Sequence, residues 1–472
     1  MYRFNFLIVV IVILSSCGAP TLHNPSSTLK ETGRSTGVHI QAMEMLDESV
    51  GVEDKNYHKQ LQRMIWVPGY TNEVRNEALK RLWAFDREGT TRIIRQQLPR
   101  IGNWSWLTEL CQWIAEEQLT ELNEALISSW ANPTSLAQTE KDRPEYIALR
   151  QMYGEEQIAD LIFETMLAAN RAWKQGYRTR CWELLHRLGQ RERLVLLLEQ
   201  TQFDNEDLFF LDLQRAKSDL GIVPHRREEI LWIRELAKEE YVPFWNEAKV
   251  ALANLGNERR DTVEMRDVPI AVSLQRHGGK NAFSRSTNSM LNQIALNIKD
   301  EKHYSETEGG GLFSVNSERF HTHKNKLTWG DAATLEILLT ALNVPEVKAH
   351  LFDYAKRDNL DESTEYGGVI ALDEKGRFEI LEFEPKVRTH DRRFNASQDM
   401  FDAAYTALFH FHFHAQKLRN GDHAGPGMGD KNYANNTRAN CLVFTFINEN
   451  KMNVDFYRHG GVVIDVGTIS IE

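Results

Sequence analysis

Leu408-Phe-His-Phe-His-Phe-His-Ala-Gln416 alternates phenylalanine with histidine over six consecutive residues. Successive side chains of a β-strand point to opposite faces of its sheet. The alternation therefore predicts a strand with three histidines (His410, His412 and His414) on one face and three phenylalanines on the other. Two imidazoles at positions i and i+2 of such a strand can converge on one cation.

A carboxylate follows the histidines closely enough to complete a metal site. The glycine-rich segment Ala424-Gly-Pro-Gly-Met-Gly-Asp430 predicts a loop that delivers Asp430. Two neutral imidazoles and one carboxylate form the ligand set of a catalytic zinc site, which leaves a fourth position open for water. We prefer His412 and His414 as ligands because they lie nearer the Asp430 loop, and His410 is an additional candidate. The alternative is that the histidines line a half-buried strand and bond to backbone carbonyls.

Composition indicates a globular protein with more than one domain. The chain has 472 residues, 42% of them hydrophobic and 26% charged, which is enough for two or three domains. Its formal net charge is -11 and no basic stripe recurs along it, so we expect no nucleic-acid partner. Cys111, Cys181 and Cys441 are scattered and predict buried, unpaired thiols.

Residues 1–17 are typical of a signal peptide. Arg3 precedes an apolar run that is too short to span a bilayer, and Leu14-Ser-Ser-Cys17 resembles the lipobox of bacterial lipoproteins. That resemblance implies that Cys17 carries a lipid and that the chain is anchored in the bacterial cell envelope, facing the periplasm or the exterior. An ordinary signal peptide or N-terminal anchor is the alternative. The composition of residues 18–48 predicts a tether.

Residues 49–260 show helical periodicity, with apolar residues recurring at three and four positions and a break expected at Gly89. Residues 72–82 are echoed by residues 177–188, and a more apolar helix is expected after each segment. Paired helices at such intervals resemble HEAT-type repeats, which stack into a solenoid and offer an extended surface for a protein partner. An irregular helical bundle is the alternative.

The remaining residues predict a connector and a second domain. Residues 261–329 predict a loop-rich connector around one helix at 287–298. Residues 330–472 predict a compact α/β or α+β domain. Its first helix is expected at 332–342 with Asp331 as the N-cap. Its other expected elements are strands at 367–372 and 378–383, a helix at 398–407, the histidine strand, and strands at 441–447 and 462–466, with a hairpin link at 448–453.

The order of Glu365, His412-Phe-His414 and Asp430 resembles the pattern of the JAB/MPN (JAMM) zinc metallopeptidase family. That family has a glutamate in a Glu-x-x-Gly-like strand start, followed by His-x-His-x7-Ser-x-x-Asp. The resemblance covers about residues 330–470 and implies His412, His414 and Asp430 as zinc ligands. It also implies Glu365 as the general base that passes a proton to the leaving amine, with Glu362 as a less favoured substitute.

The chain departs from this family pattern in two respects. Twelve residues (415–426) separate His414 from Gly427 where the family has seven, which is tolerable because loop-closure entropy grows slowly with length. Gly427 stands where the family has a serine that is thought to stabilise the oxyanion, and losing one such donor can lower a rate by roughly 10²–10³-fold. A backbone N–H of Gly427 or Gly429 could replace it.

These patterns predict a membrane-anchored lipoprotein with an all-α, HEAT-like N-terminal domain followed by an α/β (α+β) JAMM-like domain. The second domain would hydrolyse a peptide or isopeptide bond of a peptide or protein substrate with zinc-activated water. The alternative is a catalytically inactive JAMM-like fold that serves as a protein-binding or scaffold lipoprotein of the cell envelope.

Overall fold

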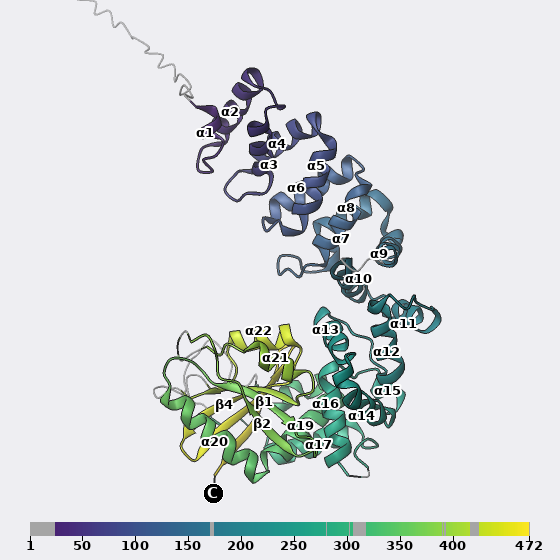
Figure 1. Ribbon diagram of the computed structural model, residues 1–472, viewed down its shortest axis with the longest axis vertical. Helices are drawn as coiled ribbons and strands as arrows, with labels where there is room; N and C mark the ends of the chain where they lie inside the picture. Colours follow the sequence, from purple (N-terminus) through teal and green to yellow (C-terminus); the bar gives the residue numbers. More distant parts are fainter. Residues whose placement is uncertain are drawn as a thin grey trace, which may run out of the picture. The chain divides into compact units, whose positions relative to one another are not determined.

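The chain divides into two units between Ala169 and Asn170 (Figure 1). The computed structural model describes residues 24–169, 174–279, 281–301, 303–304, 318–388, 390, 393–415 and 424–471. The division falls within the region predicted as one helical domain, so its helices are distributed over both units. The predicted signal peptide, including Cys17, lies outside the described residues.

The first unit is helical throughout its described length. Helices pack on near neighbours in the chain: α3 on α4, and α6 and α7 on α8. The helices are α1 (Pro25–Thr28), α2 (Thr36–Ser49), α3 (Lys55–Trp66), α4 (Asn72–Phe85), α5 (Arg87–Gln97), α6 (Trp104–Glu116), α7 (Asn123–Ala131), α8 (Pro144–Tyr153) and α9 (Ile158–Ala168).

Two features of this unit differ from the expectations from sequence. Helices α1 and α2 occupy residues predicted as a tether, and Met43 and Leu46 of α2 are buried. The prediction followed the many serine and threonine residues of this segment, which obscured the helical spacing of its apolar residues. The break predicted at Gly89 is wrong. The chain turns at Asp86, whose carboxylate accepts a 2.8 Å hydrogen bond from the N–H of Gly89 inside α5.

The second unit begins with helices and continues into a sheet. Its helix α17 confirms the helix predicted at 287–298, whereas α16 was not predicted and lies fully packed between α14 and α19. Residues 268–274 of α16 are all buried, so no polar face marks its periodicity. The helices are α10 (Gln175–Arg187), α11 (Arg191–Gln200), α12 (Leu208–Arg215), α13 (Arg227–Leu236), α14 (Val242–Ala253), α15 (Asn257–Arg260), α16 (Val268–His277), α17 (Thr287–Ile298), α18 (Phe320–His323), α19 (Trp329–Leu342), α20 (Pro345–Leu360), α21 (Gln398–Ala404) and α22 (Met428–Thr437).

The described strands of this unit form one six-stranded mixed sheet in the order β2-β1-β3-β4-β5-β6. Strands β3 and β4 pair in parallel, and the other neighbours in the described sheet are antiparallel. The predicted combination of a helical part and a C-terminal α/β domain is therefore confirmed. The strands are β1 (Gly367–Leu372), β2 (Phe378–Glu382), β3 (Phe409–His414), β4 (Cys441–Asn448), β5 (Lys451–Arg458) and β6 (Val462–Ser470).

Helices cover both faces of the sheet, which explains why every residue of β3 is buried. On one face, Phe411 and Phe413 contact Tyr354 of α20, with ring centroids 6.4 and 5.5 Å apart. On the other face, Ala434 of α22 packs against β4 and β5, and Met400 of α21 packs against β1. Figure 1 shows α20 on one side of the sheet and α21 and α22 on the other.

The N-terminus of α19 corrects the predicted cap. Thr328 is the N-cap, and Asp331 is the third residue of the helix. The Thr328 hydroxyl accepts a hydrogen bond from the Asp331 N–H at 3.3 Å, and the Asp331 carboxylate accepts one from the Thr328 N–H at 2.8 Å. This reciprocal capping box places the acidic residue one turn later than a simple N-cap.

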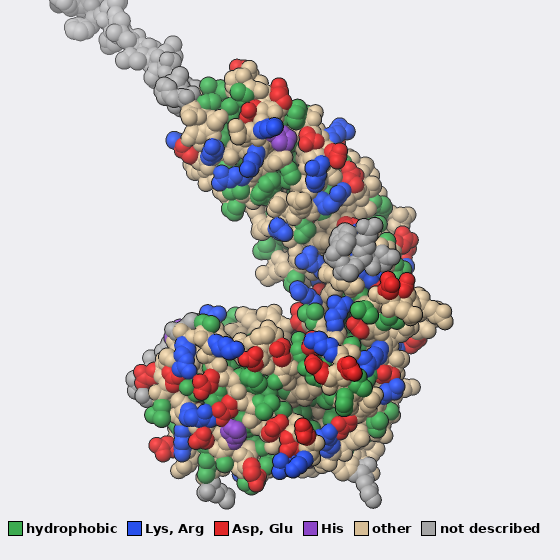
Figure 2. Space-filling view, in the orientation of Figure 1, with side chains coloured by type: hydrophobic (Ala, Val, Ile, Leu, Met, Phe, Trp, Pro, Cys, Tyr) green, Lys and Arg blue, Asp and Glu red, His purple; other side chains and the backbone are tan. Residues whose placement is uncertain are grey.

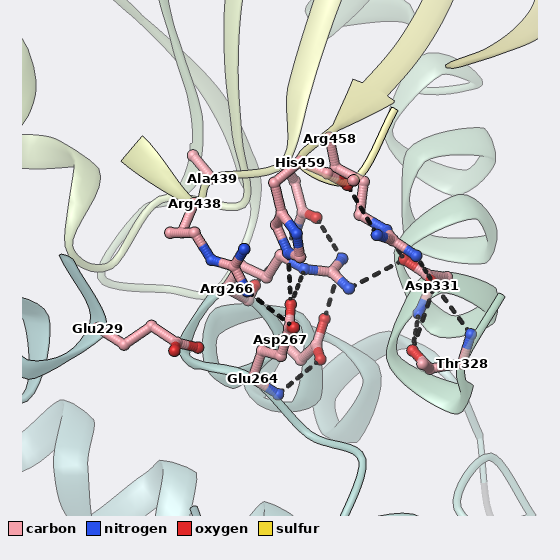
Figure 3. A network of polar contacts seen from close by, with 12 residues as sticks. Glu229, Glu264, Arg266, Asp267, Thr328, Asp331, Arg438, Ala439, Arg458 and His459 are labelled. Atoms are coloured by element: carbon pink, nitrogen blue, oxygen red, sulfur yellow. Dashed lines mark hydrogen bonds and ion pairs between the residues drawn. The ribbon is translucent and has the colours of Figure 1, made fainter. Parts of the chain in front are cut away.

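A buried ion network joins the helices of the second unit to its sheet (Figure 3). Arg266 lies 2.7 Å from the Glu264 carboxylate and 3.0 Å from that of Asp331, and it donates a 2.9 Å hydrogen bond to Asn440 at the start of β4. Arg458 at the end of β5 also binds Asp331, at 2.7 Å. Because an unpaired buried charge is strongly destabilising, these groups fix β4 and β5 against α19.

Charged side chains of both signs lie on the surface (Figure 2), whereas the described cysteines are buried. Figure 2 shows acidic and basic side chains interspersed on the visible face of both units. Cys111, Cys181 and Cys441 are buried, as predicted. Within the described ranges, no helix has both the length and the apolar character needed to cross a bilayer.

Candidate metal centre

The pairing of β1 with β3 brings Glu365 to the histidine strand. Gly367 pairs with His412 in the antiparallel register. Glu365 precedes Gly367 by two residues, so its side chain is on the same face and next to His414. Glu365, His412 and His414 are all buried, at 4, 4 and 8% exposure.

The side chains of the predicted site converge. One ligand atom from each of Glu365, His412 and His414 lies within 4.8 Å of the other two, so this buried group could hold a metal ion. The Nε2 atoms of the two histidines are 3.2 Å apart. The Asp430 carboxylate lies 3.4 Å from Nε2 of His412 and 3.7 Å from Nε2 of His414.

The spacing of these atoms is close to that of ligands around one metal ion. Zinc bonds of roughly 2.0–2.1 Å at tetrahedral angles place neighbouring ligand atoms about 3.3–3.4 Å apart. The two Nε2 atoms, 3.2 Å apart, lie close to this spacing. Asp430 approaches His412 through one carboxylate oxygen (Oδ1, 3.4 Å) and His414 through the other (Oδ2, 3.7 Å). The donors are imidazole and carboxylate, which are zinc ligands. Glu365 supplies a second carboxylate beside the two imidazoles.

Asp430 reaches the site from a helix, which corrects the predicted loop. It is the third residue of α22, and its carboxylate accepts a 2.7 Å hydrogen bond from the N–H of the N-cap residue Gly427. The surrounding glycines suggested a loop, but this bond starts a helix immediately after Gly427. The partial positive charge at the N-terminus of α22 also favours the ionised carboxylate.

The same bond decides which of the two predicted backbone donors, Gly427 or Gly429, is available to an oxyanion. The Gly427 N–H donates to Asp430, so it is already used and does not replace the family's serine as a free donor. Gly429 also lines the cavity, in the first turn of α22. The first N–H groups of a helix have no partner within the helix. Of the two backbone donors considered from the sequence, Gly429 is therefore the better placed.

Electrostatic coupling within the site favours binding of a cation. Burial acts to lower the pKa of His412, but the adjacent Asp430 and Glu365 outweigh it and raise that pKa. Burial acts to raise the pKa of Asp430, but His412 and His414 hold it well below its usual range. A bound cation would take the place of the imidazole proton as the positive partner of these carboxylates, so metal affinity would rise with pH.

His410 lies on the histidine face but is not part of the group. Its Nδ1 pairs with the hydroxyl of Tyr433 on α22 at 2.8 Å. Burial lowers the pKa of His410 to about 4, so the ring is neutral. Its Nε2 has no hydrogen-bond partner among the residues that the structure describes. The geometry therefore separates His410 from the His412 and His414 pair, in line with the preference from sequence.

A cavity of about 780 Å³ lies over the site. Phe394 stacks on His412, with ring centroids 6.0 Å apart and an interplanar angle of 7°. Arg393, Asn395, Tyr433 and Tyr457 also line this cavity. These residues were not predicted, because the elements that carry them meet only in the folded sheet and no local spacing links them to the histidines.

Comparison with known proteins gives no match. No protein-family model matches this chain, and searches of the curated proteins and of the solved structures found no significant similarity.

Proposed function

We propose that the chain is a membrane-anchored lipoprotein whose C-terminal domain is a JAMM-like, zinc-dependent peptidase or isopeptidase. The convergence of Glu365, His412, His414 and Asp430 beneath a cavity of about 780 Å³ carries this proposal. The order of elements supports it: helix, Glu365 before β1, hairpin, helix, ligand strand, Asp430 and closing strands.

The roles of the residues follow from their positions. His412, His414 and Asp430 would hold the zinc ion through two Nε2 atoms and one carboxylate. Zinc, when bound, lowers the pKa of water and polarises the scissile carbonyl. Glu365, beside the two imidazoles, would accept the proton from the attacking water and deliver it to the leaving amine. Phe394 packs against His412 and fixes the orientation of its ring.

The expected location in the cell envelope favours some classes of substrate over others. The lipobox-like sequence ending at Cys17 favours an extracytoplasmic address, so a cell-envelope peptide or protein is a better candidate than an intracellular one. The helices of the first unit pack on near neighbours, as in the HEAT-like arrangement that we propose. Such a surface would bind a protein partner and position the substrate.

The test uses the soluble form that begins after Cys17, loaded with zinc. We expect about one zinc per chain by elemental analysis, and cleavage of a mixed peptide library detected by mass spectrometry. Glu365→Gln should keep the zinc and lower the cleavage rate by roughly 10²–10⁴-fold, the usual contribution of a general base. Absence of zinc from folded protein, or equal cleavage by the variant, would refute the proposal.

A non-catalytic binding module is the second candidate. The bond between the Gly427 N–H and Asp430 favours it, because that donor is not free for an oxyanion. In this case the zinc-loaded protein would cleave no member of the library, and Glu365→Gln would change neither metal content nor binding to a partner. The same two measurements therefore separate the two functions.

A further inference from the structure

A second cavity, of about 300 Å³, adjoins the metal centre. Its walls come from α13, α21, α22 and β3, all within the second unit. Half of the ten lining residues are apolar or aromatic: Leu231, Trp232, Phe401, Ala404 and Tyr405. The other half are polar and include one carboxylate, that of Glu228. Phe401, His410 and Asn436 line both this cavity and the one over the metal centre, so the two cavities adjoin at a shared wall.

The walls of the second cavity are held in place before any ligand binds. The indole N–H of Trp232 donates a 2.8 Å hydrogen bond to the Tyr405 carbonyl, which ties α13 to the end of α21. Phe401 stacks on Tyr433 with ring centroids 6.2 Å apart, and Tyr433 is hydrogen-bonded to His410. The shared wall is therefore a chain of packed rings anchored on the ligand strand.

The position of this wall sets which part of a substrate can reach the second cavity. His410 precedes His412 by two residues on β3, which is about 7 Å along a strand. An extended peptide advances about 3.3–3.6 Å per residue. For a peptide that runs along β3, the side chain about two residues from a bond held at the metal centre therefore comes level with His410, at the wall of the second cavity.

We propose that this second cavity selects the peptide for cleavage by binding a large apolar side chain, aromatic or aliphatic, about two residues from the scissile bond. Its volume suits one such side chain, its apolar residues would pack against it, and the Glu228 carboxylate would repel an acidic one. Leu231 stands at the rim, 45% exposed, where the entering side chain would cover it. This inference rests on the proposed peptidase function.

The test measures binding without turnover. The zinc-loaded soluble chain is titrated with N-acetyl-4-fluorophenylalaninamide, and broadening of the fluorine NMR signal of the amide reports its binding. Leu231→Glu places a charge at the rim and should weaken binding by roughly tenfold or more. Leu296→Glu, at a 75% exposed leucine on α17, is the matched control and should bind as the wild type does. An excess of N-acetylleucinamide should displace the probe, and N-acetylaspartamide should not.

Equal binding by wild type and Leu231→Glu, or no binding by wild type, would overturn the inference. The peptide library separates this failure from failure of the proposed function. Cleavage without a preference for phenylalanine or leucine over alanine near the bond would overturn the inference and leave the peptidase function in place. Binding that depends on Leu231, without any cleavage, would refute the peptidase and leave a pocket for apolar side chains.

Discussion

The backbone N–H of Phe413 donates a 3.0 Å hydrogen bond to the carbonyl oxygen of Tyr366. This bond continues the β1–β3 pairing beyond Gly367 and places the flanking residues, Glu365 and His414, side by side. A shift of one residue would turn Glu365 to the phenylalanine face, because side chains alternate along a strand. The candidate metal centre therefore depends on the register of two strands that are about forty residues apart.

Loss of the imidazole pair should abolish metal binding. His412→Ala/His414→Ala removes the two nitrogens that lie 3.2 Å apart, so we expect elemental analysis to find no bound zinc. His410→Ala, on the same face of the same strand, is the matched control and should retain about one zinc per chain. Metal loss in the His410 variant alone would contradict the assigned ligands.

Removal of the charge of Asp430 should weaken metal binding and leave the fold intact. In Asp430→Asn the amide oxygen can still accept the hydrogen bond from Gly427, so α22 should form. Zinc affinity, measured by competition with a chelator, should fall by at least the roughly 10–100-fold seen when a supporting group is lost. Asp402→Asn on α21 is the control and should bind zinc as wild type does. Unchanged affinity in Asp430→Asn would remove it from the ligand set.

The second glycine of β1 should be intolerant of a side chain. A Cβ at Gly368 would lie 2.1 Å from the carbonyl oxygen of Leu381 on β2, so Gly368→Ala must move the backbone. We expect the free energy of unfolding to fall by about 1–3 kcal/mol, read from denaturant titration. A Cβ at Gly429 meets nothing within 4 Å, so Gly429→Ala should be at least as stable as wild type. Equal effects of the two changes would show that the strand spacing adjusts.

The free energy of unfolding should fall at acid pH because Asp331 becomes protonated. Burial acts to raise its pKa, but Arg266 and Arg458 outweigh it and lower that pKa. A lowered pKa stabilises the fold above the unfolded-state pKa of about 3.9, and this stabilisation is lost as the pH falls further.

Asp331→Asn should therefore unfold more easily at neutral pH, by about 3–5 kcal/mol, because the buried guanidinium of Arg458 loses its charged partner and that of Arg266 loses one of its partners. Its stability should vary less than that of wild type below pH 4. Asp353→Asn, whose carboxylate is 71% exposed on α20, is the control. If the free energy of unfolding had the same pH dependence in wild type and in Asp331→Asn, this account would be contradicted.

Residues that are close in the sequence made part of the site predictable. The alternation in β3 gives the histidine face directly, and the strand predicted after Glu365 is β1 as observed. His412 and His414 need only one strand to come together, so their convergence follows from strand geometry. Asp430 was placed near them correctly but on the wrong kind of element, because its bond to Gly427 cannot be read from glycine content.

Contacts between distant segments were beyond prediction. Trp232 lies on α13, whereas Phe401 and Tyr433 lie on α21 and α22, more than 150 residues later in the chain. The Arg266 network likewise joins residues from three regions of the second unit. Neither has a periodic or local pattern, since each depends on how the helices pack on the finished sheet. Helix α16 was missed for a related reason, because residues 268–274 are all buried and leave no polar face along most of the helix.

The parallel pairing of β3 with β4 has a consequence for the order of folding. Parallel neighbours require a crossover connection, and α22, which carries Asp430, lies in that connection. The imidazoles are in place once β3 forms, but the carboxylate arrives only when the chain has returned to lay down β4. Non-local pairings of this kind close slowly. Asp430 therefore joins His412 and His414 only when this crossover is complete, and a metal ion bound to all three would tie the crossover to β3.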